Sequence, residues 1–96
     1  MIRTIGDATT QDVFDGENSK AARKLPRELH DKARRLLDLI NSAARLDDLR
    51  IPPGNRLEAL KGDYKGFHSI RINDQWRIVF KWLDGHADNV QIVDYH

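Results

Sequence analysis

Two apolar runs separated by a short polar turn constrain the fold of this sequence more than any other feature. The runs are FHSIRI at residues 67–72 and WRIVFKW at residues 76–82, and the three residues between them, NDQ, favour a turn. Because side chains alternate between the two faces of a strand, a two-residue loop would place Ile70 opposite Arg77 and mix apolar with charged residues. The sequence therefore predicts a β-hairpin with a three-residue loop, in which Ile70 faces Ile78.

One face of this hairpin is largely apolar, and the other is cationic. The apolar face carries His68, Ile70, Ile72, Trp76, Ile78 and Phe80, and the cationic face carries Ser69, Arg71, Arg77, Val79 and Lys81. Arg71 and Arg77 come directly opposite each other, where like charges repel. Either both arginines reach water or nearby aspartates, or an anion lies between them, and the pattern leaves both interpretations open. We expect the cationic face to stay open to solvent, and we expect His68 to be a buried, hydrogen-bonded histidine.

A long amphipathic helix is predicted to begin at Pro26 and to end near Ala44 or Arg45, since proline is tolerated in a first helical turn. Its apolar stripe consists of Leu29, Ala33, Leu36, Leu37, Ile40, Ala43 and Ala44. Residues 1–5 read as a short strand, residues 7–14 as a short helix, and residues 90–95 as a last strand that places Tyr95 on the side of Arg77. The predicted fold class is α+β: an N-terminal strand and two helices packed on an antiparallel β-meander.

Length and composition narrow the function classes. The 96 residues suffice for a single domain over residues 1–96, and 16 basic residues nearly balance 15 acidic ones. The chain has no cysteine, and its four histidines lack the close spacing of a zinc site, so we expect no metal and no cofactor. No segment resembles a signal peptide or a membrane span, which predicts a cytoplasmic protein.

A basic segment covers residues 20–35, with seven basic residues against Glu28 and Asp31. Such a patch suits a phosphate backbone, and it equally suits the solvated side of a helix. The groups expected to reach the cationic face are Glu58, Lys61, Arg71, Arg77, Lys81, Tyr95 and His96. They are compatible with metal-free RNA cleavage, because RNA supplies its own 2′-OH nucleophile and needs only cations and proton-transfer groups. Tyr64, Phe67 and Tyr95 could stack on splayed bases. Many surfaces carry such residues, so the set alone does not identify this reaction.

Three motifs resemble the HigB branch of the RelE/ParE toxin superfamily. They are PGNRLEALKGD at residues 53–63, HSIRINDQWRI at residues 68–78 and VDYH at residues 93–96. The resemblance implies the RelE-like microbial ribonuclease fold and the toxin of a type II toxin–antitoxin pair. It further implies cleavage of mRNA in the ribosomal A site without metal. The implied partner is a HigA-like helix-turn-helix antitoxin, through which the complex would bind operator DNA.

The resemblance also implies site residues. The family's catalytic positions correspond to Lys61, Arg77, Asp94, Tyr95 and His96. Our hypothesis is that His96 moves a proton, Lys61 and Arg77 stabilise the phosphorane, and Tyr95 orients or stacks a base. Glu58 stands where some members have a histidine, so the general base is left open and Glu58 is an optional participant. Contacts to RNA or ribosome are expected from Arg71, Lys65, Lys81, Arg23, Lys24 and Arg27.

Two other functions remain open at this point. One is a non-enzymatic toxin that binds DNA gyrase, as in the ParE branch of the superfamily. The other is a weak toxin that serves mainly as the co-repressor of its antitoxin, which the carboxylate of Glu58 keeps open.

Overall fold

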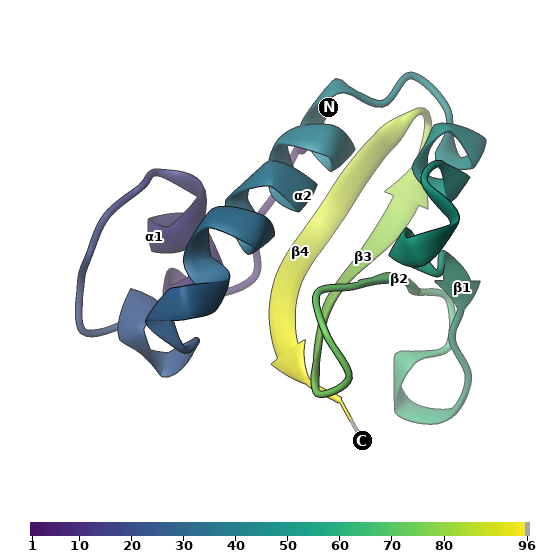
Figure 1. The fold of residues 1–96 in the computed structure, drawn as a ribbon. Coiled ribbons are helices and arrows are strands. Elements are labelled where there is room, and N and C mark those ends of the chain that lie inside the picture. Colours follow the sequence, from purple (N-terminus) through teal and green to yellow (C-terminus); the bar gives the residue numbers. More distant parts are fainter. Residues whose placement is uncertain (96) are drawn as a thin grey trace.

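The computed structural model describes residues 1–95, which form two helices on one side of a four-stranded antiparallel sheet (Figure 1). The helices are α1 (Ala8–Phe14) and α2 (His30–Ser42), and the strands are β1 (Glu58–Ala59), β2 (His68–Arg71), β3 (Trp76–Leu83) and β4 (His86–Asp94). The strands lie in the order β1-β2-β3-β4. Short 3₁₀ turns occur at Ala22–Lys24, Arg27–Leu29, Leu46–Arg50, Pro53–Asn55 and Gly62–Tyr64. No helix within residues 1–95 has the length and apolar character needed to span a membrane.

The hairpin register agrees with the prediction. Ile70 pairs with Ile78, and Arg71 pairs with Arg77. The Ile72 N–H donates to the carbonyl of Trp76 at 2.9 Å, which closes the three-residue loop. The next strand continues the apolar face, since Ile78 also pairs with Ile92 of β4.

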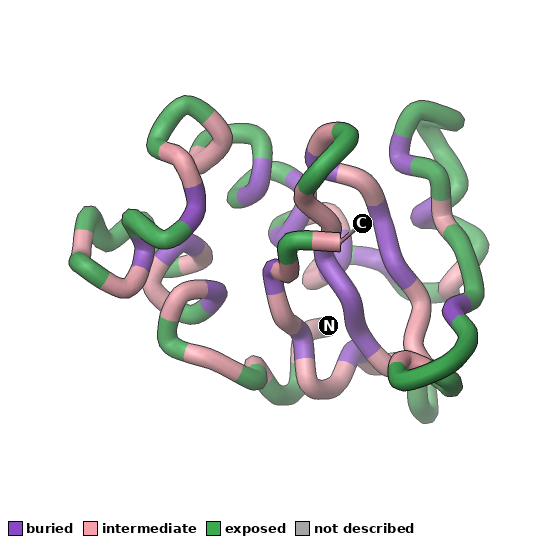
Figure 2. Tube along the Cα trace, turned by 90° about the horizontal axis from the view of Figure 1, so that it is seen from below, coloured by how far each residue is buried: buried purple, intermediate pink, exposed green. Residues whose placement is uncertain are grey.

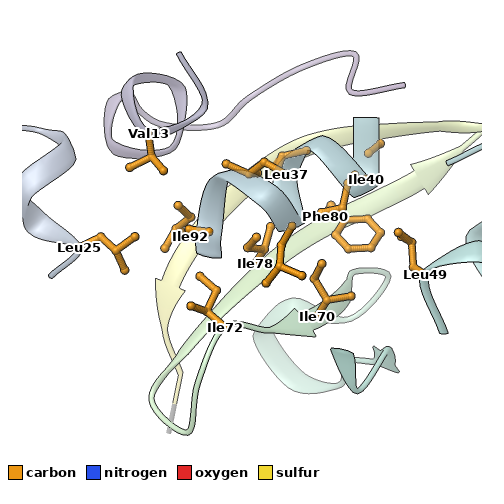
Figure 3. Packing of buried hydrophobic residues seen from close by; sticks show 14 of the residues in the cluster. Val13, Leu25, Leu37, Ile40, Leu49, Ile70, Ile72, Ile78, Phe80 and Ile92 are labelled. Atoms are coloured by element: carbon orange, nitrogen blue, oxygen red, sulfur yellow. The ribbon is translucent and has the colours of Figure 1, made fainter. Parts of the chain in front are cut away.

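The hydrophobic core lies between α2 and the apolar face of the sheet (Figure 3). Leu37 and Ile40 of α2 and Ile70, Ile78 and Phe80 of the sheet are all fully buried. Burial of each such side chain adds about 1.5–3 kcal/mol to the stability of the fold, relative to leaving the side chain exposed. In Figure 2 the buried residues follow the central strands, and the exposed residues gather in the connecting loops. The core therefore fixes which face of the sheet remains for function.

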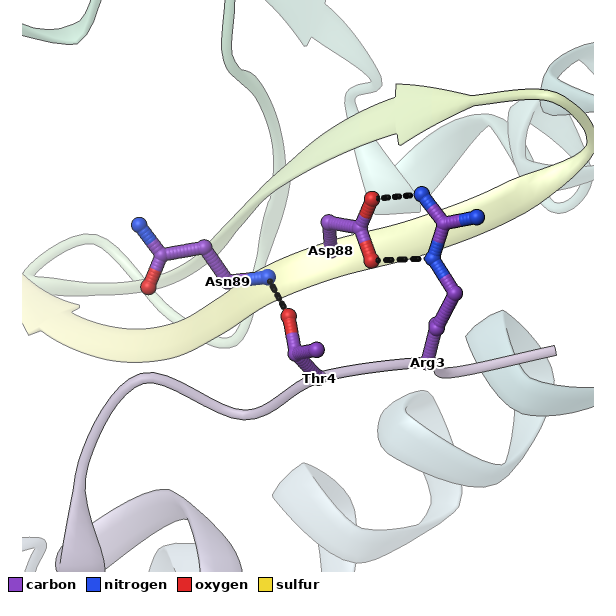
Figure 4. A network of polar contacts seen from close by, with 4 residues as sticks. All are labelled: Arg3, Thr4, Asp88 and Asn89. Carbon is purple, nitrogen blue, oxygen red and sulfur yellow. Dashed lines mark hydrogen bonds and ion pairs between the residues drawn. The ribbon is translucent and has the colours of Figure 1, made fainter.

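The N-terminal segment lies parallel to the edge strand β4, but as two isolated bridges, Ile2 with Ala87 and Ile5 with Val90, rather than a continuous strand. The Arg3 guanidinium pairs with the Asp88 carboxylate beside it (Figure 4). The helix α1 that follows is capped by Asp7, which accepts a hydrogen bond from the Thr10 N–H at 2.7 Å.

The long helix was predicted to begin at Pro26, but Arg27–Leu29 form a 3₁₀ turn and the α-helix begins only at His30. Two further predicted boundaries were wrong, each for a local reason. The long helix ends at Ser42 because the Asp48 carboxylate accepts hydrogen bonds from the N–H groups of Ala44 and Arg45, both at 3.0 Å. These bonds hold the chain in a new turn instead of a further helical turn. The last strand begins at His86 rather than at residue 90. Asp84 and Gly85 both have positive φ and form a two-residue hairpin loop that lets the strand start early.

Two threonine hydroxyls provide a test of how burial strengthens the attachment of the N-terminal segment. The buried Thr10 hydroxyl accepts the Ile92 N–H at 2.8 Å, and the exposed Thr4 hydroxyl accepts the Asn89 N–H at 2.7 Å (Figure 4). Thr10→Val leaves a buried N–H without a partner and should lower the unfolding free energy by about 1–3 kcal/mol. Thr4→Val should cost less than about 0.5 kcal/mol, because water replaces its hydroxyl. Urea denaturation measures both, and equal losses would contradict this account.

Candidate functional site

The cationic face of the hairpin is partly covered, so the prediction of an open face was wrong. Ser69 and Val79 lie on this face and are fully buried. Lys81 and Arg77 project from the same face, and each lies over an aromatic ring. The Lys81 Nζ is 5.1 Å from the centre of the Phe67 ring, and the guanidinium carbon of Arg77 is 5.5 Å from that of Tyr95. Cations and aromatic rings therefore cover the face together.

The covering rings form a small cluster of Tyr64, Phe67 and Tyr95, which we call the aromatic cluster. Tyr64 contacts Phe67 edge to face, with ring centres 5.7 Å apart, and its ring centre is 6.2 Å from that of Tyr95. All three rings are only partly buried. Aromatic rings with cations beside them and partial access to solvent suit the stacking of nucleic-acid bases.

Arg77 lies at the centre of the site. Its Nη1 donates to the Ser69 hydroxyl at 3.4 Å and lies 3.8 Å from Oε2 of Glu58. Its Nε is buried and has no hydrogen-bond acceptor among residues 1–95. The Arg77 side chain is only 16% exposed, whereas that of Glu58 is 50% exposed. Arg77 is thus a largely buried cation with spare donor capacity and a loosely held carboxylate beside it.

Strand pairing brings these groups together from distant parts of the sequence. Glu58 of β1 pairs with Ser69 of β2, and Arg77 of β3 is the diagonal neighbour of Ser69 across the hairpin. The Tyr95 N–H donates to the carbonyl of Gln75 at 2.8 Å, and the Tyr95 ring lies on the side of Arg77, as the sequence predicted.

Arg71, the other arginine of the cationic face, has a different environment. Its guanidinium pairs with the carboxylate of Asp74 in the hairpin loop, and the Asp74 side chain is almost fully exposed. Of the two interpretations left open, pairing with an aspartate holds for Arg71. An exposed pair of this kind contributes about 0–1 kcal/mol.

The remaining predicted catalytic residues lie around this centre. Lys61 is exposed and directly precedes the 3₁₀ turn Gly62–Tyr64, whose last residue belongs to the aromatic cluster. Lys65 is exposed in the same loop. The Asp94 carboxylate accepts a hydrogen bond from Nε2 of Gln75 at 3.0 Å. His96 lies outside the described residues.

The predicted contacts at Arg23, Lys24 and Arg27 are exposed, but the structure does not bring them to Arg77. They belong to the helical layer, which packs on the apolar face of the sheet. Arg27 instead lines a polar pocket of about 290 Å³ together with residues of α1, α2 and the loop between them. Their contact with RNA or ribosome stays a prediction.

Sequence reasoning missed Ser69 as a partner of Arg77, although the predicted register already made the two diagonal neighbours. It also missed Tyr64 and Phe67 as a cover for the face. The expectation of a buried, hydrogen-bonded His68 was wrong, because the residue is only partly buried and its Nδ1 has no hydrogen-bond partner among residues 1–95. Within the same residues, no group of three or more His, Asp or Glu side chains is placed to hold a metal ion.

Comparisons with known proteins identify the family and the fold of the chain. Residues 9–96 match the model of the HigB-like toxin family, described as the RelE-like toxin of the type II toxin–antitoxin system HigB. The toxin HigB-1 of Vibrio cholerae serotype O1 is 43% identical over 76 residues, which are 79% of this chain and 80% of that protein. The endoribonuclease HigB of Proteus vulgaris is 42% identical over 41 residues, which are 43% of this chain and 45% of that protein.

A solved structure of a YafQ mutant from E. coli superimposes with a TM-score of 0.66 at 18% sequence identity. The match covers 98% of this chain and 93% of that one. The two helices on an antiparallel sheet therefore form the RelE-like toxin fold. The chain belongs to the HigB-like family of toxins of type II toxin–antitoxin systems.

His68 should make the stability of this protein depend on pH near neutrality. Burial lowers the pKa of the His68 imidazole below its ordinary value of 6.5, and the charge of Arg50 lowers this pKa further. The unfolded chain therefore takes up a proton at His68 as the pH falls through about 6.5, whereas the folded chain takes it up only at a lower pH. The unfolding free energy should fall between pH 7.5 and pH 5.5, and His68→Gln should reduce that fall. Urea denaturation at both pH values checks this, and an unchanged pH dependence in the variant would contradict it.

Proposed function

We propose that this toxin is a ribosome-dependent endoribonuclease that cuts mRNA by metal-free attack of the ribose 2′-OH on the adjacent phosphate. Membership of the HigB-like family supports the toxin function, and the similarity to the endoribonuclease HigB of Proteus vulgaris supports RNA as its target. The observation that carries the proposal is Arg77, a mostly buried guanidinium beside the aromatic cluster. The Arg77 guanidinium can bind a phosphate of RNA, and the aromatic cluster beside it can stack on a neighbouring base.

The reaction needs two proton transfers and charge stabilisation. A base takes the proton of the 2′-OH, and the oxygen forms a new bond to phosphorus. The bond from phosphorus to the 5′-oxygen breaks, and an acid protonates that leaving oxygen. The products are a 2′,3′-cyclic phosphate and a 5′-OH end. Negative charge gathers on the phosphorane between these steps, and fixed cations at that position lower the barrier.

The proposed roles come from the resemblance to the family, and the positions of the described residues are compatible with them. Arg77 and Lys61 stabilise the phosphorane, and Tyr95 stacks on or orients a base. His96 transfers a proton, and Asp94 supports the C-terminal end of the site through its hydrogen bond with Gln75. Arg71, Lys65 and Lys81 contact the RNA backbone around this centre. Arg23, Lys24 and Arg27 contact ribosomal RNA from the helical layer.

The partners are proposed from the family alone. Residues 1–96 act as one toxin domain in the cytoplasm. A HigA-like helix-turn-helix antitoxin neutralises the toxin and carries the complex to operator DNA. The ribosome presents mRNA in its A site.

Primer extension on a reporter mRNA, translated in vitro with the purified toxin, tests the proposal. We expect cuts within codons that require ribosomes, and a loss of about 100-fold or more in cleavage rate for Arg77→Ala. Arg71→Ala is the matched control, because Arg71 lies on the same face but pairs with Asp74. The cleavage rate should fall much less in Arg71→Ala than in Arg77→Ala.

An equal loss of cleavage rate in the two arginine variants would contradict the proposed role of Arg77 in stabilising the phosphorane. Growth arrest in cells without mRNA cuts would instead support binding of gyrase or another target. Operator binding by the antitoxin complex without growth arrest would support the co-repressor function.

A further inference from the structure

The carboxylate of Glu58 lies beside Arg77 without forming a full hydrogen bond to it. The shortest distance, from Oε2 of Glu58 to Nη1 of Arg77, is 3.8 Å. A strong arginine–carboxylate pair is bidentate, with nitrogen–oxygen distances of about 2.7–2.9 Å. Glu58 therefore compensates the charge of Arg77 while leaving most of its donors without a close acceptor.

Arg77 is held in place by groups other than Glu58. Its Nη1 donates to the Ser69 hydroxyl at 3.4 Å, and its guanidinium lies over the Tyr95 ring at 5.5 Å. Ser69 is fully buried between β1 and β3, so its hydroxyl is a fixed acceptor. A neutral hydroxyl and an aromatic ring can orient a guanidinium without neutralising it. Removal of the Glu58 charge should thus leave the position of Arg77 unchanged.

Glu58 can leave Arg77 at small structural cost. It belongs to β1, a two-residue strand at the edge of the sheet, and its side chain is half exposed. The carboxylate can turn into water without disturbing the core. A phosphodiester and a carboxylate are both anions that would use the same guanidinium, and close together they repel each other.

We propose that Glu58 occupies Arg77 in the resting toxin as a stand-in for the RNA phosphate, and that binding of a phosphodiester exchanges the carboxylate for the phosphate. Ser69 is the positioning residue that keeps Arg77 in place during this exchange. The inference rests on the proposed function in that the phosphate belongs to RNA. It assigns Glu58 a role in substrate affinity, in place of the general base that its position in the motif suggested.

The exchange is tested first with inorganic phosphate as the probe, titrated into the full chain and followed by NMR at the backbone amides of Ser69 and Tyr95. Glu58→Gln should lower the apparent Kd for phosphate about two- to five-fold, the range expected for loss of one partly exposed competing charge. Asp63→Asn is the matched control, because Asp63 is an exposed acid in the nearby loop, and it should leave the Kd almost unchanged. In an Arg77→Met background, Glu58→Gln should have no effect.

Three results would overturn the proposal. One is equal tightening by Glu58→Gln and Asp63→Asn, and another is tightening that persists without Arg77, since both would indicate a general charge effect. The third is no detectable phosphate binding in either the wild type or Glu58→Gln.

Kinetics on mRNA separate the exchange from base catalysis. Under the proposal, Glu58→Gln lowers KM and retains kcat, because glutamine cannot compete as an anion and no proton transfer is lost. A large fall in kcat with unchanged phosphate binding would make Glu58 the base and overturn the proposal. Phosphate binding that responds to Glu58→Gln, in a protein that cuts no RNA, would support the exchange at Arg77 and refute the proposed function.

Discussion

The pairing register of the β2–β3 hairpin is the constraint on which the rest of the structure depends. It places Ile70 and Ile78 under α2, and the same alternation places Arg77 and Ser69 on the opposite face. A slip of one residue would move every side chain to the other face, burying arginine against α2 and exposing isoleucine. The packing of the core and the position of the site residues therefore depend on the same pairing register, because the apolar residues that stabilise the hairpin also orient the charged ones.

The opposite face combines two kinds of interaction that usually occur apart. Arg77 and Lys81 lie over aromatic rings, so the cations are partly shielded from water and remain close to the surface. A cation in such surroundings interacts more strongly with an arriving anion than a fully hydrated one does. The same shielding makes an unpaired guanidinium costly, which gives a physical reason for a carboxylate such as Glu58 beside it. In our proposal, Arg77 both binds the phosphate and, in the resting state, has its charge compensated by Glu58.

Much of this architecture could be predicted from the sequence, because alternation in strands and periodicity in helices are local signals. The hairpin register, the apolar stripe of α2 and the side on which Tyr95 lies all followed from such patterns. The covering of the cationic face did not, since it depends on how Tyr95 and the loop with Tyr64 fold back over the sheet. The early end of α2 depends on the carboxylate of Asp48, six residues beyond the last helical residue. The spacing of apolar residues along the helix does not predict this contact. The predicted register placed Ser69 next to Arg77, but a serine at this position does not by itself indicate a hydrogen bond with arginine.

We propose that RNA binds to the covered cationic face, with Arg77 at the centre of the contact. The most direct measurement is a crystal structure of the chain with a short RNA whose 2′-OH groups are methylated, so that it cannot be cut. The account predicts a phosphate within hydrogen-bond distance of the Arg77 guanidinium, a base against the aromatic cluster, and the Glu58 carboxylate turned away. RNA bound along the basic residues of the helical layer, with Arg77 and Glu58 still side by side, would contradict it.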